Sequence, residues 1–171
     1  IALLALVGVA QAQTVVFDIA ANPWNLPLGS GQGESASAGD VAKIEQDGVT
    51  LTFSAEGEKT TPPRMWTGPQ LRMYANNDVT ITAGGRVIES VLFTYTTSNT
   101  DQDYFTNDID ETQTKSGTAW TGSVSSVTFK TATSKGRLQI TKIEVTIKND
   151  DPNYVATPKI SPATGTYYAA Q

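Results

Sequence analysis

The sequence predicts an all-β fold, a two-sheet antiparallel sandwich of the jelly-roll-like kind. Several segments alternate apolar and polar residues with a period of two, most clearly residues 49–54, and this alternation is typical of strands that bury one face. Clusters of Gly, Asn and Ser separate these segments, as expected for turns. No segment shows a sustained 3.6-residue period. We therefore expect about seven or eight short strands in two packed sheets.

The first half of the chain contains three expected strands. Residues 14–19 are rich in β-forming residues, whereas residues 22–40 are rich in Gly, Ser, Pro and Asn and predict a long loop. Residues 49–54 place Val, Leu and Phe on one face, and residues 78–82 repeat this pattern. We expect residues 83–86 to form a hairpin turn, because paired glycines tolerate the positive φ that such turns require.

The second half continues the pattern. Residues 87–96 predict a strand with Val91, Phe93 and Tyr95 on one face. A polar, acidic loop is expected over residues 99–115, and a further strand over residues 126–130. A turn over residues 133–136 then leads to the last strand.

The last strand, over residues 137–148, changes phase within its length. Its apolar residues are two apart before Thr141-Lys142 and again two apart after it, but the two series are offset by one residue. Because a one-residue slip turns side chains to the opposite face, this offset predicts a β-bulge at Thr141-Lys142. The expected inward set is Leu138, Ile140, Ile143, Val145 and Ile147.

The chain begins with an apolar, uncharged run that ends in Ala10-Gln11-Ala12. This run resembles a signal-peptide core with its cleavage site and a clipped N-terminus, so we expect residues 1–12 to be a signal peptide and the protein to be secreted or on the cell surface. The run is too short to span a membrane. The alternative is a buried first strand or helix.

Beyond the leader, residues 13–148 suit one domain large enough to bury a core. Residues 149–153 are polar, contain a proline and predict a linker. Residues 154–171 are too few to form a core of their own and are interpreted as the truncated start of a second β module. Further domains of the same chain are therefore expected partners.

Charge and composition exclude several function classes. The net charge of −5 argues against nucleic acid as a partner. The absence of Cys removes disulfides, and the absence of His removes Ser-His and Cys-His nucleophile pairs and histidine-ligated zinc. We find no nucleophile elbow or phosphate-binding loop. Carboxylates such as Asp101 with Asp103, or Asp108 with Glu111, lie too close in sequence to establish a catalytic pair across a cleft, so no catalytic residues and no enzymatic activity are expected.

Two stretches carry a family resemblance. Residues 155–167, which read Pro158-Lys159-Ile160-Ser161-Pro162 at their centre, resemble the opening of the chitobiase/β-hexosaminidase C-terminal-type repeat, a small immunoglobulin-like module. Residues 61–66, 71–81, 120–129 and 139–145 resemble the exported β-sandwich modules of Bacteroides and Prevotella type bacteria that precede such repeats. The resemblance implies a modular, extracytoplasmic context and no particular activity.

Arg64, Trp66, Arg72 and Tyr74 are the candidate ligand-binding residues. Pro62 and Pro63 lack backbone donors, so the segment that follows them is expected to be a loop or an edge strand. Arg72 and Tyr74 share one face, opposite Leu71 and Met73. Aromatic rings stack on the apolar face of a sugar and guanidinium groups bond its hydroxyls, which favours a polysaccharide or glycan as partner. The alternative is structural, with the rings covering the core and the arginines stacked on them.

Asp101, Asp103 and Asp108 are the candidate metal ligands, in a loop that also carries Asn and Glu residues. Closely spaced oxygen ligands suit Ca²⁺, although the spacing does not match an EF-hand. A solvated acidic loop is the favoured alternative, so no cofactor is expected apart from this candidate Ca²⁺. Trp120 precedes a predicted Thr121-Gly122 turn at the start of a strand, and is expected to plug the core or cap an edge.

These observations together predict a non-catalytic accessory module of an exported multi-domain bacterial protein, with glycan binding as its candidate activity. A structural or adhesin-like spacer with a protein partner is the alternative from another class. An accessory domain of an exported hydrolase or nuclease is the third.

Overall fold

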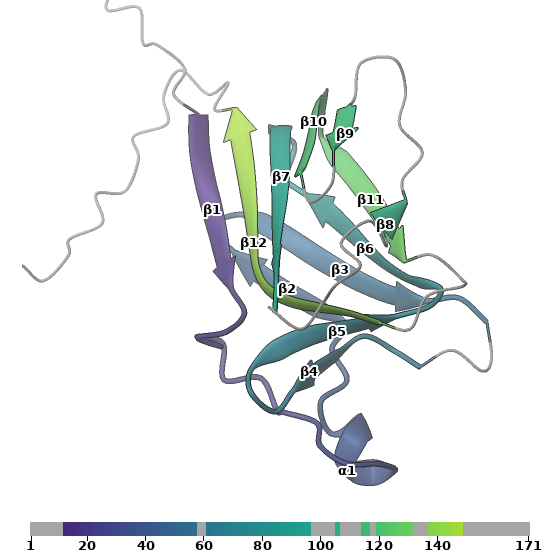
Figure 1. Ribbon diagram of the computed structural model, residues 1–171. Coiled ribbons are helices and arrows are strands. Elements are labelled where there is room, and N and C mark those ends of the chain that lie inside the picture. The colour runs from purple at the N-terminus through teal and green to yellow at the C-terminus, as the bar shows by residue number, and fades with distance from the viewer. Residues whose placement is uncertain are drawn as a thin grey trace, which may run out of the picture.

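The computed structural model describes residues 12–57, 61–96, 105–106, 114–116, 119–131 and 137–148. Within these residues, two antiparallel sheets face each other in a sandwich, and the one helix, α1 (Glu34–Ser37), is four residues long (Figure 1). No helix in the described part is long and apolar enough to cross a membrane. The all-β, two-sheet fold class predicted from the alternating segments is confirmed.

The larger sheet has seven strands among the described residues, six of them along one path and β1 beside β12. In spatial order they are β4 (Arg64–Trp66), β5 (Gln70–Tyr74), β12 (Arg137–Lys148), β7 (Val87–Tyr95), β10 (Ala119–Val124) and β9 (Thr114–Ser116), with β1 (Ala12–Asp18).

The smaller sheet has five strands in the described part of the chain. Their order is β2 (Lys43–Gln46), β3 (Val49–Ala55), β6 (Asn77–Thr82), β11 (Ser126–Thr131) and β8 (Phe105–Thr106). The strand β8 and all of β9 except Ser116 lie within residues 99–115, which the sequence predicted as an acidic loop.

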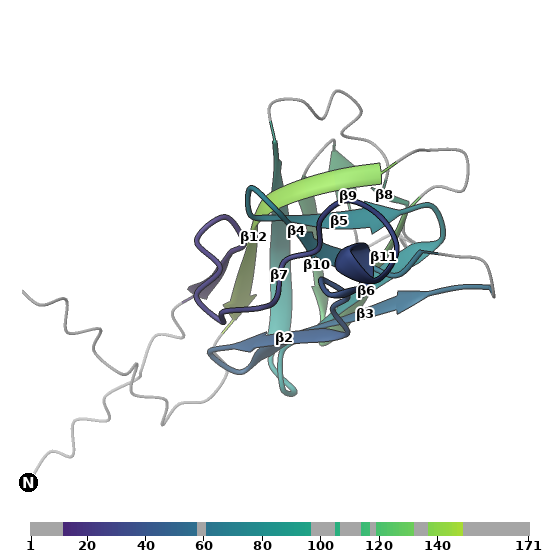
Figure 2. The same ribbon diagram turned by 90° about the horizontal axis from the view of Figure 1, so that it is seen from below.

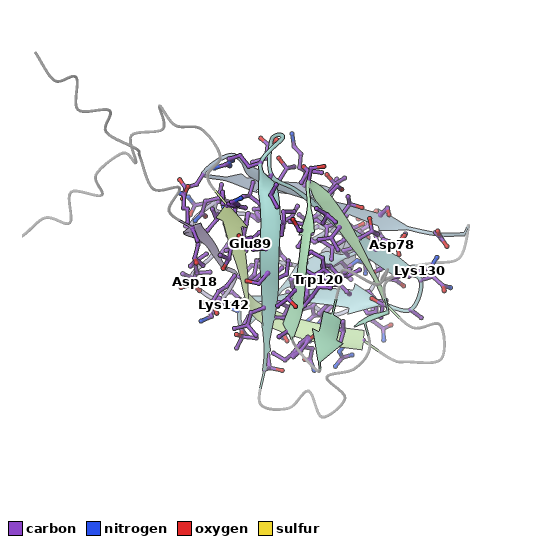
Figure 3. All side chains as sticks on the ribbon, turned by 90° about the horizontal axis from the view of Figure 1, so that it is seen from above. Asp18, Asp78, Glu89, Trp120, Lys130 and Lys142 are labelled. Atoms are coloured by element: carbon purple, nitrogen blue, oxygen red, sulfur yellow. The ribbon has the colours of Figure 1, made fainter. Side chains whose placement is uncertain are left out.

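The core fills the space between the sheets with the apolar residues that alternate along each strand. Val49, Leu51 and Phe53 of β3 are buried, as the alternation predicts. Aromatic side chains join the two layers: the rings of Trp120 and Phe129 meet edge-on with centroids 6.2 Å apart, in an arrangement that suits the charge distribution of aromatic rings. Trp120 is 1% exposed and lies between the layers (Figure 3), so the predicted core plug is confirmed.

The strand β12 carries the bulge that the phase slip predicts. Its register with β7 shifts between Ile140 and Lys142, and all five residues of the predicted inward set are buried. Residues 137–140 pair with β5, whereas residues 142–148 pair with β1. The bulge therefore stands where β12 changes its neighbour from one strand to another.

Three details differ from the sequence predictions. The turn over residues 83–86 has positive φ at both glycines, but it connects β6 to β7 in the other sheet and is not a hairpin. Thr121-Gly122 lies inside β10 next to a register shift and is not a turn. The strand β2 was not expected, because it buries only Ile44 strongly and shows little alternation of its own.

Candidate functional site

The strands β4 and β5 form a hairpin at one end of the larger sheet, so β4 is an edge strand, as the preceding prolines predict (Figure 1). Met65, Leu71 and Met73 point into the core with no exposed surface. Residues 72 and 74 therefore lie on the outer face, which confirms the predicted sidedness of β5.

All four sequence-predicted site residues lie on this outer face. Arg64 stands directly opposite Arg72 in the β4–β5 register, and Tyr74 is two residues further along β5. Arg64, Trp66, Arg72 and Tyr74 are each partly buried and none belongs to the buried core. We call these four residues, with Gln70 and Arg137, the β4–β5 patch.

Trp66 is covered by an arginine. The Cζ atom of Arg72 lies 4.0 Å from the centroid of the Trp66 ring, a cation–π contact within the usual range. One face of the indole, which a sugar ring could otherwise occupy, is therefore already stacked against the guanidinium group. A ligand at this position would meet Arg72 first, supported from below by Trp66.

Arg64 is neutralised by Asp40. Its Nε donates a hydrogen bond to Oδ1 of Asp40, and the two residues are joined by an isolated antiparallel bridge. Asp40 belongs to the segment after α1, which lies against β4 (Figure 2). This pair holds the loop on the edge strand, and because its two charges cancel, it offers a ligand no net positive charge.

Arg72 has a different electrostatic environment. Burial lowers the pKa of Arg72, and the positive charge of Arg137 lowers it further, while a side-chain hydrogen bond with Tyr74 acts in the opposite direction. Arg137 stands opposite Tyr74 in the β12–β5 register. Among the described residues, neither Arg72 nor Arg137 has a carboxylate within 4.0 Å. The β4–β5 patch is thus locally cationic on a chain with a net charge of −5.

Sequence reasoning missed three members of this neighbourhood. Gln70 shares the face of Arg72 two residues earlier, which alternation alone could have indicated. Asp40 is 24 residues from Arg64, and Arg137 is 63 residues from Tyr74, which it faces, so no local pattern connects them. Gln70 is only 8% exposed, which makes it an unusual polar residue for an outer face.

The candidate Ca²⁺ ligands Asp101, Asp103 and Asp108 lie outside the described residues. So do both carboxylate pairs weighed for catalysis. Within the part of the chain that the structure describes, no group of three or more acidic side chains is arranged to hold a metal ion.

Comparison with protein-family models, with curated proteins and with solved structures finds no match to this chain.

Proposed function

We propose that this chain is a non-catalytic accessory module of an exported protein that binds a glycan through the β4–β5 patch. The observation that carries the proposal is the contrast between its two neighbouring arginines. Arg64 is paired with Asp40, whereas Arg72 is stacked on Trp66 and has no carboxylate partner among the described residues. A planar, positively charged donor is therefore held in place without a carboxylate partner among the described residues.

Preorganisation of this kind favours binding. The stack on Trp66 restricts the rotamers of Arg72 before any ligand arrives, so less conformational entropy is lost on binding. Tyr74 adds an aromatic ring and a hydroxyl next to it. Aromatic contacts of this type contribute only about 1 kcal/mol each. We therefore expect one module to bind weakly, with a dissociation constant in the range of roughly micromolar to millimolar. Tandem modules would raise retention through effective concentration.

A structural spacer module is the second candidate, and the covered ring of Trp66 favours it. Shielding of apolar surface at the end of a sheet is by itself enough to account for an arginine stacked on a tryptophan. In that case the patch stabilises the β4–β5 hairpin and binds nothing. An adhesin-like module and an accessory domain of a hydrolase or nuclease stay alternatives from the sequence.

The test is a glycan array with the full chain, followed by calorimetric titration of each hit. Trp66→Ala and Arg72→Ala are compared with Lys43→Ala, which removes one positive charge from an exposed ion pair on β2, in the other sheet. We expect Trp66→Ala and Arg72→Ala to weaken binding by about tenfold or more, and Lys43→Ala to leave it unchanged.

Thermal unfolding of each variant separates a site from a structural contact. Weaker binding with an unchanged melting temperature supports the proposal. The proposal is overturned in favour of the spacer if the unmodified chain binds no glycan and the Trp66→Ala and Arg72→Ala variants unfold at a much lower temperature.

A further inference from the structure

Two buried polar atoms of the β4–β5 patch have no hydrogen-bond partner. They are Oε1 of Gln70 and Nε of Arg72, both on β5. Buried polar groups are nearly always hydrogen-bonded, and an exception calls for an explanation. Two exceptions only two residues apart, on the same side of one strand, point to a group that is supplied from outside the chain.

The two atoms need complementary partners. The amide oxygen Oε1 accepts a hydrogen bond, whereas the Nε–H of Arg72 donates one. A hydroxyl can do both, because its hydrogen is donated while its oxygen lone pairs accept. Gln70 stands directly opposite Trp66 in the β4–β5 register. Because neither atom has open surface in the free chain, the side chains of Gln70 and Arg72 must shift outward to receive this hydroxyl, which would then lie beside the indole of Trp66.

The charges of the patch require something further. Arg137 stands opposite Tyr74 in the β12–β5 register, and Arg72 shares the outer face of β5 with Tyr74, so the two arginines lie on neighbouring strands of one face. Neither has a carboxylate partner among the described residues. A planar anion next to both would relieve their repulsion, and a carboxylate matches the fork geometry of a guanidinium group.

We infer that the β4–β5 patch selects an acidic sugar, a uronic acid, with its carboxylate against Arg72 and Arg137 and a neighbouring hydroxyl between Gln70 and the Nε of Arg72. This inference rests on the proposed glycan binding and adds the ligand class to it. Gln70 then recognises the hydroxyl through a hydrogen bond, and Arg72 and Arg137 recognise the carboxylate through its charge.

The experiment titrates the full chain with oligogalacturonate and with the same oligomer fully methyl-esterified, which keeps every hydroxyl and removes the charge. Oligoglucuronate serves as the second acid, to compare stereochemistry. We expect either acid, or both, to bind at least tenfold more tightly than the ester, and added salt to reduce this preference. Arg137→Gln is expected to reduce the preference, whereas Lys43→Gln on the other sheet is expected to leave it intact.

Gln70→Leu separates the hydroxyl contact from the charge contact. We expect it to weaken acid and ester binding by about the same factor, roughly tenfold, because it removes the acceptor and leaves both arginines. Its melting temperature should stay the same or rise, since an unpartnered buried amide is replaced by an apolar group. Gln70→Leu that binds the acid as tightly as the unmodified chain would overturn the inference, because a trapped water would then account for the two unpartnered atoms.

The outcomes also distinguish the two proposals. If a neutral glycan binds at the patch and no acid binds more tightly than its ester, the acidic-sugar inference fails and glycan binding stands. If no glycan of either kind binds, both fail.

Discussion

Individual glycines allow the loop before β2 to lie directly on the edge strand β4. The N–H of Gly29 donates to the carbonyl of Met65 at 2.9 Å, and the N–H of Met65 donates to the carbonyl of Gly39 at 2.8 Å. A Cβ atom at Gly39 would lie 2.1 Å from the oxygen of Met65 and 2.3 Å from the nitrogen of Gly29. Only a residue without a side chain fits at position 39. The close contact between this loop and β4, the strand that carries Trp66, therefore depends on Gly39.

Gly39→Ala is expected to lower the free energy of unfolding by about 1–3 kcal/mol, the usual effect of forcing an extra methyl into a closed space. The clash is with backbone atoms, which cannot turn aside. Urea denaturation measures the change as a lower midpoint at constant slope. Gly31→Asn is the control: Gly31 has a φ of 61° and open space around it, and Asn tolerates that conformation. Equal midpoints for Gly39→Ala and the unmodified chain would refute the contact.

Asp78 gives a second prediction at this scale. It lies on β6 next to Lys130 (Figure 3), whose ammonium group is paired with Glu56. Burial raises the pKa of Asp78, the charge of Lys130 opposes this rise, and the charge of Glu56 adds to it. The folded state therefore holds the proton more tightly than the unfolded state. This contribution to stability is full at a pH below the ordinary pKa and is lost as the pH rises through the raised pKa.

Asp78→Asn should remove this loss. At about pH 7 we expect the melting temperature of the variant to equal or exceed that of the unmodified chain. Between about pH 4 and pH 7 the melting temperature of the variant should fall less than that of the unmodified chain. Glu45→Gln, in an exposed ion pair on β2, is the matched loss of one negative charge and should not change the decline. A less stable Asp78→Asn variant with an unchanged pH dependence would show that the carboxylate is favourable where it lies.

At the scale of elements, β12 is one strand with two neighbours along the same edge. Its extra residue, Thr141, accepts a hydrogen bond from the N–H of Ala20 through its carbonyl, and its Oγ1 donates to the carbonyl of Thr94 at 3.1 Å. The bulge thus bends β12 at the point where its pairing with β5 stops and its pairing with β1 starts.

Deletion of Thr141 would make the apolar alternation of β12 continuous, with Ile140 and Ile143 two residues apart. Without the bulge β12 would not bend between its two neighbours, so we expect the shortened strand to lose its pairing with either β5 or β1. The free energy of unfolding should fall by several times the effect of Thr141→Ala, which removes one hydrogen bond worth about 1 kcal/mol. Denaturant titration of the two variants checks this, and a deletion variant as stable as Thr141→Ala would mean that the bend does not need the extra residue.

The strands that could be predicted from the sequence are those with their own alternating pattern. The phase slip near Thr141 even located the bulge. The strands β2 and β10 could not be predicted in this way: β2 has one strongly buried apolar residue, and β10 has a glycine at position 122 inside it. Pairing with a stronger neighbour forms these elements, and no pattern of their own records it.

At the scale of the molecule, the same distinction holds for the candidate site. Alternation along β5 predicted which side Arg72 and Tyr74 would face. It could not predict that Asp40 neutralises one arginine, that Arg137 stands beside the other, or that Arg72 covers Trp66. These contacts depend on how distant segments meet in the folded chain, and they determine the charge that a ligand would encounter.

The extent of the folded unit is a prediction at this scale. Lys148 pairs with Ala12 and Val87, which protects the backbone up to the end of β12. The polar segment 149–153 predicts the cleavage site that follows. We expect limited proteolysis, read by mass spectrometry, to leave a resistant fragment that ends near Lys148. Residues 154–171 surviving as long as the strands would place the boundary further along the chain.

The pairing of Ala12 with Lys148 also determines how the molecule responds to tension. The strands β1 and β12 are antiparallel, and these two residues stand together at one end of the pair. A force that pulls Ala12 and Lys148 apart would open the β1–β12 ladder from that end, one pair of residues after another, instead of loading all its hydrogen bonds at once. Unzipping of this kind needs less force than sliding two strands along each other. Force applied between these two residues would therefore separate β1 from β12 at a lower load than force applied at opposite ends of the two strands.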